Sequence, residues 1–542
     1  MGKSRSSNLE GLPFFSRMIK KFLTPERLCL IAIILVGAFF RLWQIESGQY
    51  FTYDQARDYL IIKKMVVDGK LTLVGPTVSI APGFFLPPFY YYSLIPFLWL
   101  FKFHLFGPDF YTALLGIASI YLFYLLAKDF FGQIPALVSS LAFALNPYLI
   151  QTNRHAWNPN TLVFFILFFA LAGERYLFSR KKTYLFWAIF SLSWAIGLHL
   201  TAIAFVPLAV YLLYHEIKVF GLNKRVLLSF LAPLLIVFPL VAFDFRHRFP
   251  ISKAALSYLT SQKQGPFFSS LLIRLTHLFF DLVKVPVTLF SGLFQVQNLT
   301  IRPSNITAFS RVSFGLTATS FDKLKLFFTI LIIAFSVFAF SNYFKRFPLK
   351  AKYIAALWLM GFLVRLFFPV SSFYFYYYLI LFPFLFLLFT FFIFNFYKAR
   401  NSGKGKIFSI SAVMIISVFS LLPGGIKSET RPESYFLPAC KIIADDYLEG
   451  KEIAIVSNPA DSSRWEKNGL EYRYFLETKF NLPLKDWEIK DYQRASILYL
   501  VDEGRLKDPL SLRGMEMESF EPKRVEKVWQ AETGQKIYKL LK

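Results

Sequence analysis

Two carboxylates stand four residues apart just beyond the first long apolar stretch of the sequence. Asp54 and Asp58 belong to Tyr53-Asp-Gln-Ala-Arg-Asp-Tyr59, with Arg57 between them. In a helix, i,i+4 spacing places both carboxylates on one face. A carboxylate held there can take a proton from a hydroxyl or an amine, and Arg57 can bind an anion. The simpler alternative is a solvated helix start with Asp54 as a cap.

A second polar cluster is the short turn Asn153-Arg-His-Ala-Trp-Asn-Pro-Asn160. A turn between two apolar runs rarely needs this much hydrogen-bonding capacity, so we interpret it as a binding segment for phosphate or sugar hydroxyls. Arginine offers a planar fork to a phosphate, and histidine can act as a donor or a proton source. The candidate binding residues are Arg154, His155, Trp157, Asn158 and Asn160.

A turn-rich loop, residues 75–83, leads into the aromatic segment Leu86-Pro-Pro-Phe-Tyr-Tyr-Tyr92. Tyrosine rings present flat apolar faces with a hydroxyl at one end, which suits a sugar or a lipid headgroup. We therefore take Tyr91 as a candidate binding residue. The alternative is an ordinary aromatic belt at the membrane surface.

Three further residues complete the candidate set: His199, Arg246 and His247. His199 could equally be a packing histidine, and the Arg246-His247 pair could be charge that snorkels to the interface. The six histidines never show the spacing His-Glu-x-x-His, so no metal-binding site built from protein ligands alone is predicted. Cys29 and Cys440 lie in different regions, and no disulfide framework follows from them.

Long apolar helices must position these segments. The chain has 542 residues, of which 55% are hydrophobic, including 67 Phe and 29 Tyr. This is more apolar surface than a soluble core can hide, so lipid must solvate much of it. A helix that crosses about 30 Å of hydrocarbon needs about 20 apolar residues. Eleven stretches qualify as spans, two of them short: residues 28–45, 109–127, 134–152, 161–178, 183–198, 200–215, 226–243, 324–342, 353–369, 373–395 and 406–422.

Lysine and arginine decide the orientation. If the tyrosine-rich run 86–103 lies along the outer interface instead of crossing, every short inner segment is basic, as the positive-inside rule requires. This predicts a multi-pass protein of the plasma membrane, with its N-terminus in the cytoplasm and its C-terminal domain outside. The predicted parts are a basic cytoplasmic tail (1–27), a membrane domain (28–428) and an extracytoplasmic domain (429–542).

The charge distribution supports this division. The formal net charge is +26, yet only 13 of the 34 acidic residues precede Ser428. The basic excess therefore belongs to the membrane domain, where it fits loop topology and anionic lipids better than nucleic acid, for which no motif is present. Beyond residue 440, short apolar runs at 453–456 and 497–501 flank an amphipathic segment at 463–478, which predicts a small α/β domain. Apolar pieces such as 267–295 predict further helices lying on the outer membrane surface.

On these residues the chain resembles the GT-C superfamily of membrane glycosyltransferases, most closely the family-39-like group of protein O-mannosyltransferases and lipid A aminoarabinose transferases. The resemblance covers roughly residues 25–425: the acid after the first span, the Pro-Pro interfacial segment, the turn at Phe106-Gly-Pro108 and the Asn-Pro-rich second outer turn. Two departures stand out. The family often has Asp-Glu where this chain has Asp54-Gln55, and many members have a second acid in the second outer loop, where this chain has His155.

The resemblance implies an inverting transfer of a sugar from a polyprenyl-phosphate-linked donor to a glycan, lipid or protein acceptor outside the cytoplasm. By this analogy Asp54 is the general base and Asp58 its runner-up. A divalent cation could assist, although the sequence contains no dedicated ligand set for one. Two other classes stay open. A lipid or glycan transporter would also be polytopic, but transporters carry charged or broken helices at mid-membrane depth. A catalytically inactive relative that serves as a binding protein is the third alternative.

Overall fold

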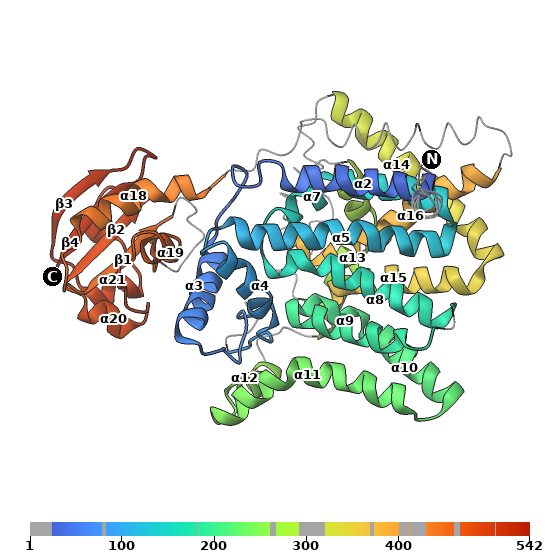
Figure 1. The fold of residues 1–542 in the computed structure, drawn as a ribbon, viewed down its shortest axis with the longest axis horizontal. Helices are drawn as coiled ribbons and strands as arrows, with labels where there is room; N and C mark the ends of the chain where they lie inside the picture. Colours follow the sequence, from blue (N-terminus) through green and yellow to red (C-terminus); the bar gives the residue numbers. More distant parts are fainter. Residues whose placement is uncertain are drawn as a thin grey trace, which may run out of the picture.

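The computed structural model describes residues 24–78, 83–179, 181–260, 267–291, 320–368, 373–399, 411, 430–459, 467–504 and 506–542. A helical bundle forms most of the molecule, and a C-terminal domain lies beyond one end of it (Figure 1). The helices of the bundle run for the most part alongside one another. They are α2 (Pro25–Leu42), α5 (Phe106–Phe131), α6 (Gln133–Leu145), α7 (Pro147–Asn153), α8 (Leu162–Leu177), α9 (Tyr184–Leu198), α10 (Val206–Phe220), α11 (Lys224–Arg246), α13 (Phe267–Ser291), α14 (Ser320–Arg346), α15 (Pro348–Phe367) and α16 (Phe382–Ala399), with α7 bent by 60° from α6.

Apolar helices of membrane-spanning length are present in the described part of the chain. Four meet the length and composition of a span, and a pair bent by 60° is a fifth. These four are Phe106–Phe131, Asn158–Leu177, Leu200–Phe220 and Lys224–Arg246, and the bent pair is α6 with α7. Ten of the eleven predicted spans fall on helices, and most of the eleventh, 406–422, lies outside the described residues. The multi-pass class is thus supported, whereas the count of eleven stays a prediction.

The bend between α6 and α7 has a local cause. Pro147 occupies the first position of α7, where its missing N–H costs nothing. The Asn146 side chain accepts from the Leu149 amide at 3.1 Å and donates to the Leu289 carbonyl at 2.8 Å. The bend at Asn146, just before the second outer turn (residues 153–160), is therefore held against Leu289 of α13.

Helices α3 (Tyr53–Asp68), α4 (Phe89–Leu100) and α12 (Pro250–Thr260) lie at the end of the bundle that faces the C-terminal domain (Figure 1). Among the 3-10 helices η1 (Asn158–Thr161), η2 (Leu200–Phe205) and η6 (Phe375–Ile380), η6 contacts both of the others. With 12 residues, α4 is about 18 Å long and too short to cross the hydrocarbon. This agrees with the interfacial prediction for 86–103.

Helix α13 differs from the surface helix that we predicted around 267–295. Val285, Leu289 and Phe290 near its C-terminal end are buried, and the Phe290 ring packs on Phe386 of α16 at 5.2 Å. The sequence did not reveal this burial, because an amphipathic helix on a membrane and one docked on a bundle have the same periodicity.

The C-terminal domain is the small α/β unit that the sequence predicted. Its sheet has the order β1-β2-β4-β3, with β1 and β2 parallel and the other pairs antiparallel. Its elements are α18 (Glu433–Asp446), β1 (Ile453–Asn458), α19 (Leu470–Thr478), α20 (Ile489–Arg494), β2 (Ile497–Asp502), η7 (Pro509–Ser511), α21 (Met515–Phe520), β3 (Arg524–Gln530) and β4 (Lys536–Leu541). The predicted boundary at 428/429 lies outside the described residues.

The C-terminal domain docks on α3. The Phe51 amide donates to the Arg431 carbonyl at 3.0 Å, and the Arg431 amide donates to the Gln49 carbonyl at 2.8 Å. The Lys63 ammonium lies 3.0 Å from the Glu477 carboxylate. Nδ2 of Asn468 donates to the Tyr53 hydroxyl at 3.1 Å. Tyr53, the residue that precedes Asp54, is therefore hydrogen-bonded to the C-terminal domain.

Candidate active site

Helix α3 presents the two candidate acids, and its start is fixed by the sequence Thr52-Tyr-Asp-Gln55. This pattern is a capping box: the Thr52 amide donates to the Gln55 side-chain oxygen at 3.0 Å. The helix ends at Gly69, whose φ of 63° suits glycine. The local geometry explains why Gln55 can replace the glutamate common in the resembling family, since either side chain can accept this hydrogen bond.

Asp54 and Asp58 lie in different environments although both contact Arg57. The Asp54 side chain is 43% exposed and lies 3.1 Å from the Arg57 guanidinium. The Asp58 side chain is 2% exposed and accepts from Arg57 at 2.8 Å and from the Tyr91 hydroxyl at 2.9 Å. Asp54 can therefore reach a substrate, whereas Asp58 and Tyr91 form a brace behind Arg57. The Tyr91 ring is buried, and its role in substrate binding stays a prediction.

The electrostatics of this brace follow from burial. Burial raises the pKa of Asp58 to about 6, although Arg57 opposes the rise. Burial alone would lower the pKa of Arg57, but the negative charges of Asp58 and Asp54 outweigh it and raise that pKa. At neutral pH the cluster therefore holds one cation between two carboxylates.

Three ring side chains pack together into an aromatic wall. It consists of Trp157 from the second outer turn, His199 from the end of α9, and Tyr376 from η6. The Trp157 and Tyr376 rings meet edge to face at 4.6 Å, and the His199 ring lies 5.8 Å from Tyr376. The Asp54 charge is among the weaker electrostatic influences on Tyr376, after burial and two neighbouring tyrosines. The structure thus brings together three segments that are far apart in the sequence.

Sequence reasoning missed Tyr376. The signal was present as the run Phe373-Tyr-Phe-Tyr-Tyr-Tyr378, which we read as the beginning of the span 373–395. In the structure these residues form η6 before α16 begins. A tyrosine run at the end of an apolar stretch is typical of an interface, and it could have been separated from the span on that ground.

Two histidines of the candidate set, His155 and His199, are neutral at pH 7. Burial lowers the pKa of His155 and of His199 to about 4. Nδ1 of His199 accepts from the Thr201 amide at 3.3 Å, which leaves the proton of the neutral ring on Nε2. We predicted that His155 would help to neutralise a phosphate, and a neutral imidazole can do so only as a hydrogen-bond donor.

The asparagines of the second outer turn hold the turn in place. Nδ2 of Asn158 donates to the Leu198 carbonyl at 2.6 Å, and Nδ2 of Asn160 donates to the His155 carbonyl at 2.8 Å. The Ala156 amide donates to the buried Asp109 carboxylate at 2.8 Å. Trp157 is the residue of this turn that joins the aromatic wall. The substrate roles of Asn158 and Asn160 stay predictions.

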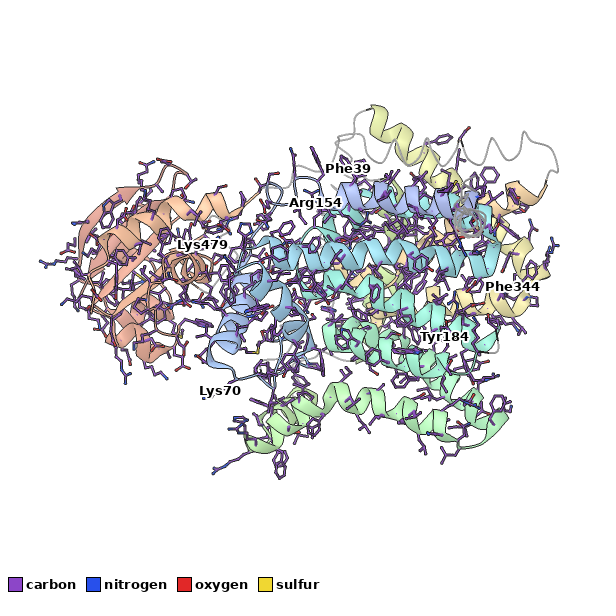
Figure 2. All side chains as sticks on the ribbon, viewed as in Figure 1. Phe39, Lys70, Arg154, Tyr184, Phe344 and Lys479 are labelled. Atoms are coloured by element: carbon purple, nitrogen blue, oxygen red, sulfur yellow. The ribbon has the colours of Figure 1, made fainter. Side chains whose placement is uncertain are left out.

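Arg154 caps a helix in this structure. Its Nη1 donates to the Phe40 and Trp43 carbonyls at 3.0 and 2.7 Å, and its Nη2 donates to the Gln44 carbonyl at 2.7 Å. These carbonyls belong to the C-terminal end of α2, where cations stabilise unsatisfied acceptors. Figure 2 places Arg154 toward the end of the bundle that faces the soluble domain, away from Tyr184 and Phe344. A phosphate could recruit Arg154 only if these hydrogen bonds broke.

Arg246 and His247 lie at the end of α11 and are exposed. Nδ1 of His247 lies 2.9 Å from the Phe243 carbonyl, and the two rings pack at 4.2 Å. Their neighbour Asp244 caps α12 by accepting from the Ile251 amide at 2.7 Å. No described contact brings Arg246 or His247 to Asp54, so their predicted role in phosphate binding has no geometric support here.

Two open cavities lie beside the C-terminal domain. One, of about 510 Å³, is lined by Glu46, Phe101, Lys102, His104, Phe106 and Lys479; Lys479 is labelled on the soluble domain in Figure 2. The other, of about 550 Å³, lies between α3 and the soluble domain. Asp54 lines neither cavity.

Metal binding has no support in the described part of the chain. Within the residues that the structure describes, no three His, Cys, Asp or Glu side chains converge as ligands. The two acids of the candidate site are both engaged by Arg57. The donor set therefore does not fit a divalent cation, and we derive no step through one.

Comparisons with known proteins bear on this geometry. The sequence profile of the dolichyl-phosphate-mannose-protein mannosyltransferase family matches residues 86–243. The crystal structure of ArnT from Cupriavidus metallidurans bound to undecaprenyl phosphate superposes with a TM-score of 0.52 at 12% identity, covering 94% of this chain and 97% of that one. The apo oligosaccharyltransferase of Archaeoglobus fulgidus superposes with a TM-score of 0.50 at 13% identity, covering 96% and 74%. No curated protein sequence matches the chain.

The chain resembles the GT-C glycosyltransferases. The structural likeness shows a common fold, and the profile adds a sequence relation over α4 to α11. This GT-C-like region contains Trp157 and His199, while Asp54 precedes it and Tyr376 follows it. The site is therefore assembled from residues both inside and outside the matched segment.

Proposed function

We propose that this protein is a membrane glycosyltransferase that moves a sugar from a polyprenyl-phosphate-linked donor to an acceptor on the extracytoplasmic face. The observation that carries the proposal is the half-exposed carboxylate of Asp54, held by Arg57, in a chain with a GT-C-like fold. The lipid of the ArnT structure, undecaprenyl phosphate, supports a donor of that chemical class.

The residues suggest one inverting displacement. The acceptor hydroxyl or amine attacks the anomeric carbon while Asp54 takes its proton. The bond between the anomeric carbon and the phosphate oxygen breaks, and its electron pair leaves with the lipid phosphate. Asp54 ends as a neutral carboxylic acid. Because a phosphate is a good leaving group once its charge is neutralised, no general acid is required.

The other residues of the site position the reactants. Arg57 is held by Asp58 and Tyr91, so it fixes the Asp54 carboxylate from one side. The Trp157 and Tyr376 rings can stack on the apolar face of a sugar. Such stacking adds affinity that hydrogen bonds to the sugar hydroxyls alone would not supply in water. His199 can donate from Nε2 to a sugar hydroxyl. Asn468 of the C-terminal domain is hydrogen-bonded to Tyr53, the residue before Asp54. The acceptor can therefore approach Asp54 along the C-terminal domain.

The test is a transfer assay with purified protein and a panel of polyprenyl-phosphate sugars, preceded by mass spectrometry of the lipids that copurify. We expect one donor class to support transfer, with the anomeric configuration of the product inverted by NMR. A product with retained configuration would contradict the single displacement. The copurification of a flipped glycolipid with no transfer to any acceptor would favour a transporter instead.

A further inference from the structure

Helix α13 turns a row of polar side chains toward the rest of the protein. They follow one another at intervals of three or four residues and so share one helix face: Arg274, His277, Asp281, Lys284 and Thr288. The opposite face is apolar and exposed, with Leu272, Leu275, Phe279 and Val283. A helix with its polar face inward and its apolar face outward is suited to a lipid environment that borders a polar site.

The polar row faces α15 and η6. Nη1 of Arg274 donates to the Leu366 carbonyl of α15 at 2.7 Å. The Tyr378 hydroxyl of η6 donates to the Asp281 carboxylate at 2.6 Å. Arg365 of α15 approaches the same carboxylate, with its Nε 3.6 Å away. Three separate elements therefore contribute to one charged cluster.

Arg365 is the most unusual member of this cluster. It is 5% exposed, its guanidinium stacks on the Phe373 ring at 4.1 Å, and its buried Nε, 3.6 Å from Asp281, has no hydrogen-bond partner among the described residues. The buried Nε of Arg274 and Oγ1 of Thr288 also have no partner among the described residues. Burying such donors unpaired is costly, so they are poised to bind an acceptor-rich group.

The charge of the cluster indicates what that group is. Arg365 and Lys284 are within electrostatic reach of the Asp281 carboxylate, and Arg274 is within reach of Arg365, so three cations accompany one carboxylate. A planar guanidinium held against an aromatic ring and a flexible ammonium together suit a phosphate, which offers several acceptor oxygens and a negative charge. A neutral sugar would not balance this excess.

The cluster also adjoins the candidate active site. Phe373, on which Arg365 stacks, packs on Tyr377 at 5.1 Å, and Tyr377 packs on Tyr376 at 4.8 Å. Tyr376 belongs to the aromatic wall. A group bound at Arg365 would thus be joined to the aromatic wall through packed rings.

We propose that Arg365 and the polar row of α13 bind the phosphate of a polyprenyl phosphate. This inference rests on the proposed function and names the residues that hold its donor. It moves the phosphate site from Arg154, which is engaged at the end of α2, to α13 and α15.

The test measures the affinity of the purified full-length protein for undecaprenyl phosphate by native mass spectrometry in detergent. Lys284→Gln and Arg365→Gln should each weaken binding about tenfold or more, since each removes a charge-assisted hydrogen bond to phosphate. Lys345→Gln is the matched control, because Lys345 is exposed at the end of α14. Undecaprenol, which lacks the phosphate, should bind both variants and the wild type alike.

Each outcome separates this inference from the proposed function. Wild-type affinity for undecaprenyl phosphate in a folded Lys284→Gln protein would overturn the phosphate site, and the proposed function would stand. Equal competition by phosphatidylglycerol would also overturn it, because the cluster would then be a general anionic-lipid site. If the wild type binds no undecaprenyl phosphate, both proposals fail. Asp54→Asn should bind the lipid normally, since Asp54 acts on the acceptor.

Discussion

Replacing Asp58 with Asn should change how the stability of the protein depends on pH. Burial raises the pKa of Asp58 from its ordinary value of 3.8 to about 6. An acid whose pKa is higher in the folded protein than in the unfolded chain favours folding when it is protonated, so its contribution is largest at low pH. That contribution is lost as the pH rises from about 4 to about 6. Two pKa units correspond to about 3 kcal/mol.

Asparagine has the shape of the protonated acid and cannot ionise. The free energy of unfolding of Asp58→Asn, measured relative to the wild type, should therefore rise by about 3 kcal/mol between pH 4 and pH 7. The assay is thermal unfolding in detergent, followed by tryptophan fluorescence at both pH values. Asp54→Asn serves as the control, because the Asp54 side chain is half exposed. A difference between Asp58→Asn and the wild type that stays constant with pH would refute the reasoning.

Three further predictions follow from the same contacts. Arg154→Ala should lower the free energy of unfolding by about 0.5–1.5 kcal/mol, because the carbonyls at the end of α2 lose their donor. A normal melting temperature with lost lipid affinity would restore the phosphate role. Trp157→Ala and Tyr376→Ala should raise the KM for the donor. Tyr376→Phe should keep most of the donor affinity if the ring face binds the sugar. Equal losses in both Tyr376 variants would show that the hydroxyl binds it instead. Lys507→Cys, in a Cys29→Ser background, should react with a membrane-impermeant maleimide in intact cells; protection would reverse the predicted orientation.

The sequence predicted the apolar helices well because length and hydropathy alone define them. Ten of the eleven predicted spans fall on helices, and α3 carries Asp54 and Asp58 as the i,i+4 spacing indicated. The capping box at Thr52 and Gln55 was also readable, although we did not use it. Such features are local, so they do not depend on which segments meet in space.

The partners of each polar residue were harder to predict. Arg154 has the residue type that binds phosphate, but the same donors fit the carbonyls at the end of α2. Tyr376 was missed because we assigned the whole tyrosine run 373–378 to an apolar span, although such a run is typical of an interface. The polar row of α13 was visible at helical spacing, yet only the contacts with Arg365 and Tyr378 reveal that it faces inward.

The central claim is that Asp54 is the general base. The most direct measurement is the single-turnover rate of Asp54→Asn with an identified donor and acceptor, compared with the wild type. Asparagine is nearly isosteric and removes only basicity, so we expect unchanged donor affinity and a transfer rate slowed by about 10²-fold or more. A near-normal rate in this variant would contradict the claim, and a loss found only in Asp58→Asn would assign the base to Asp58.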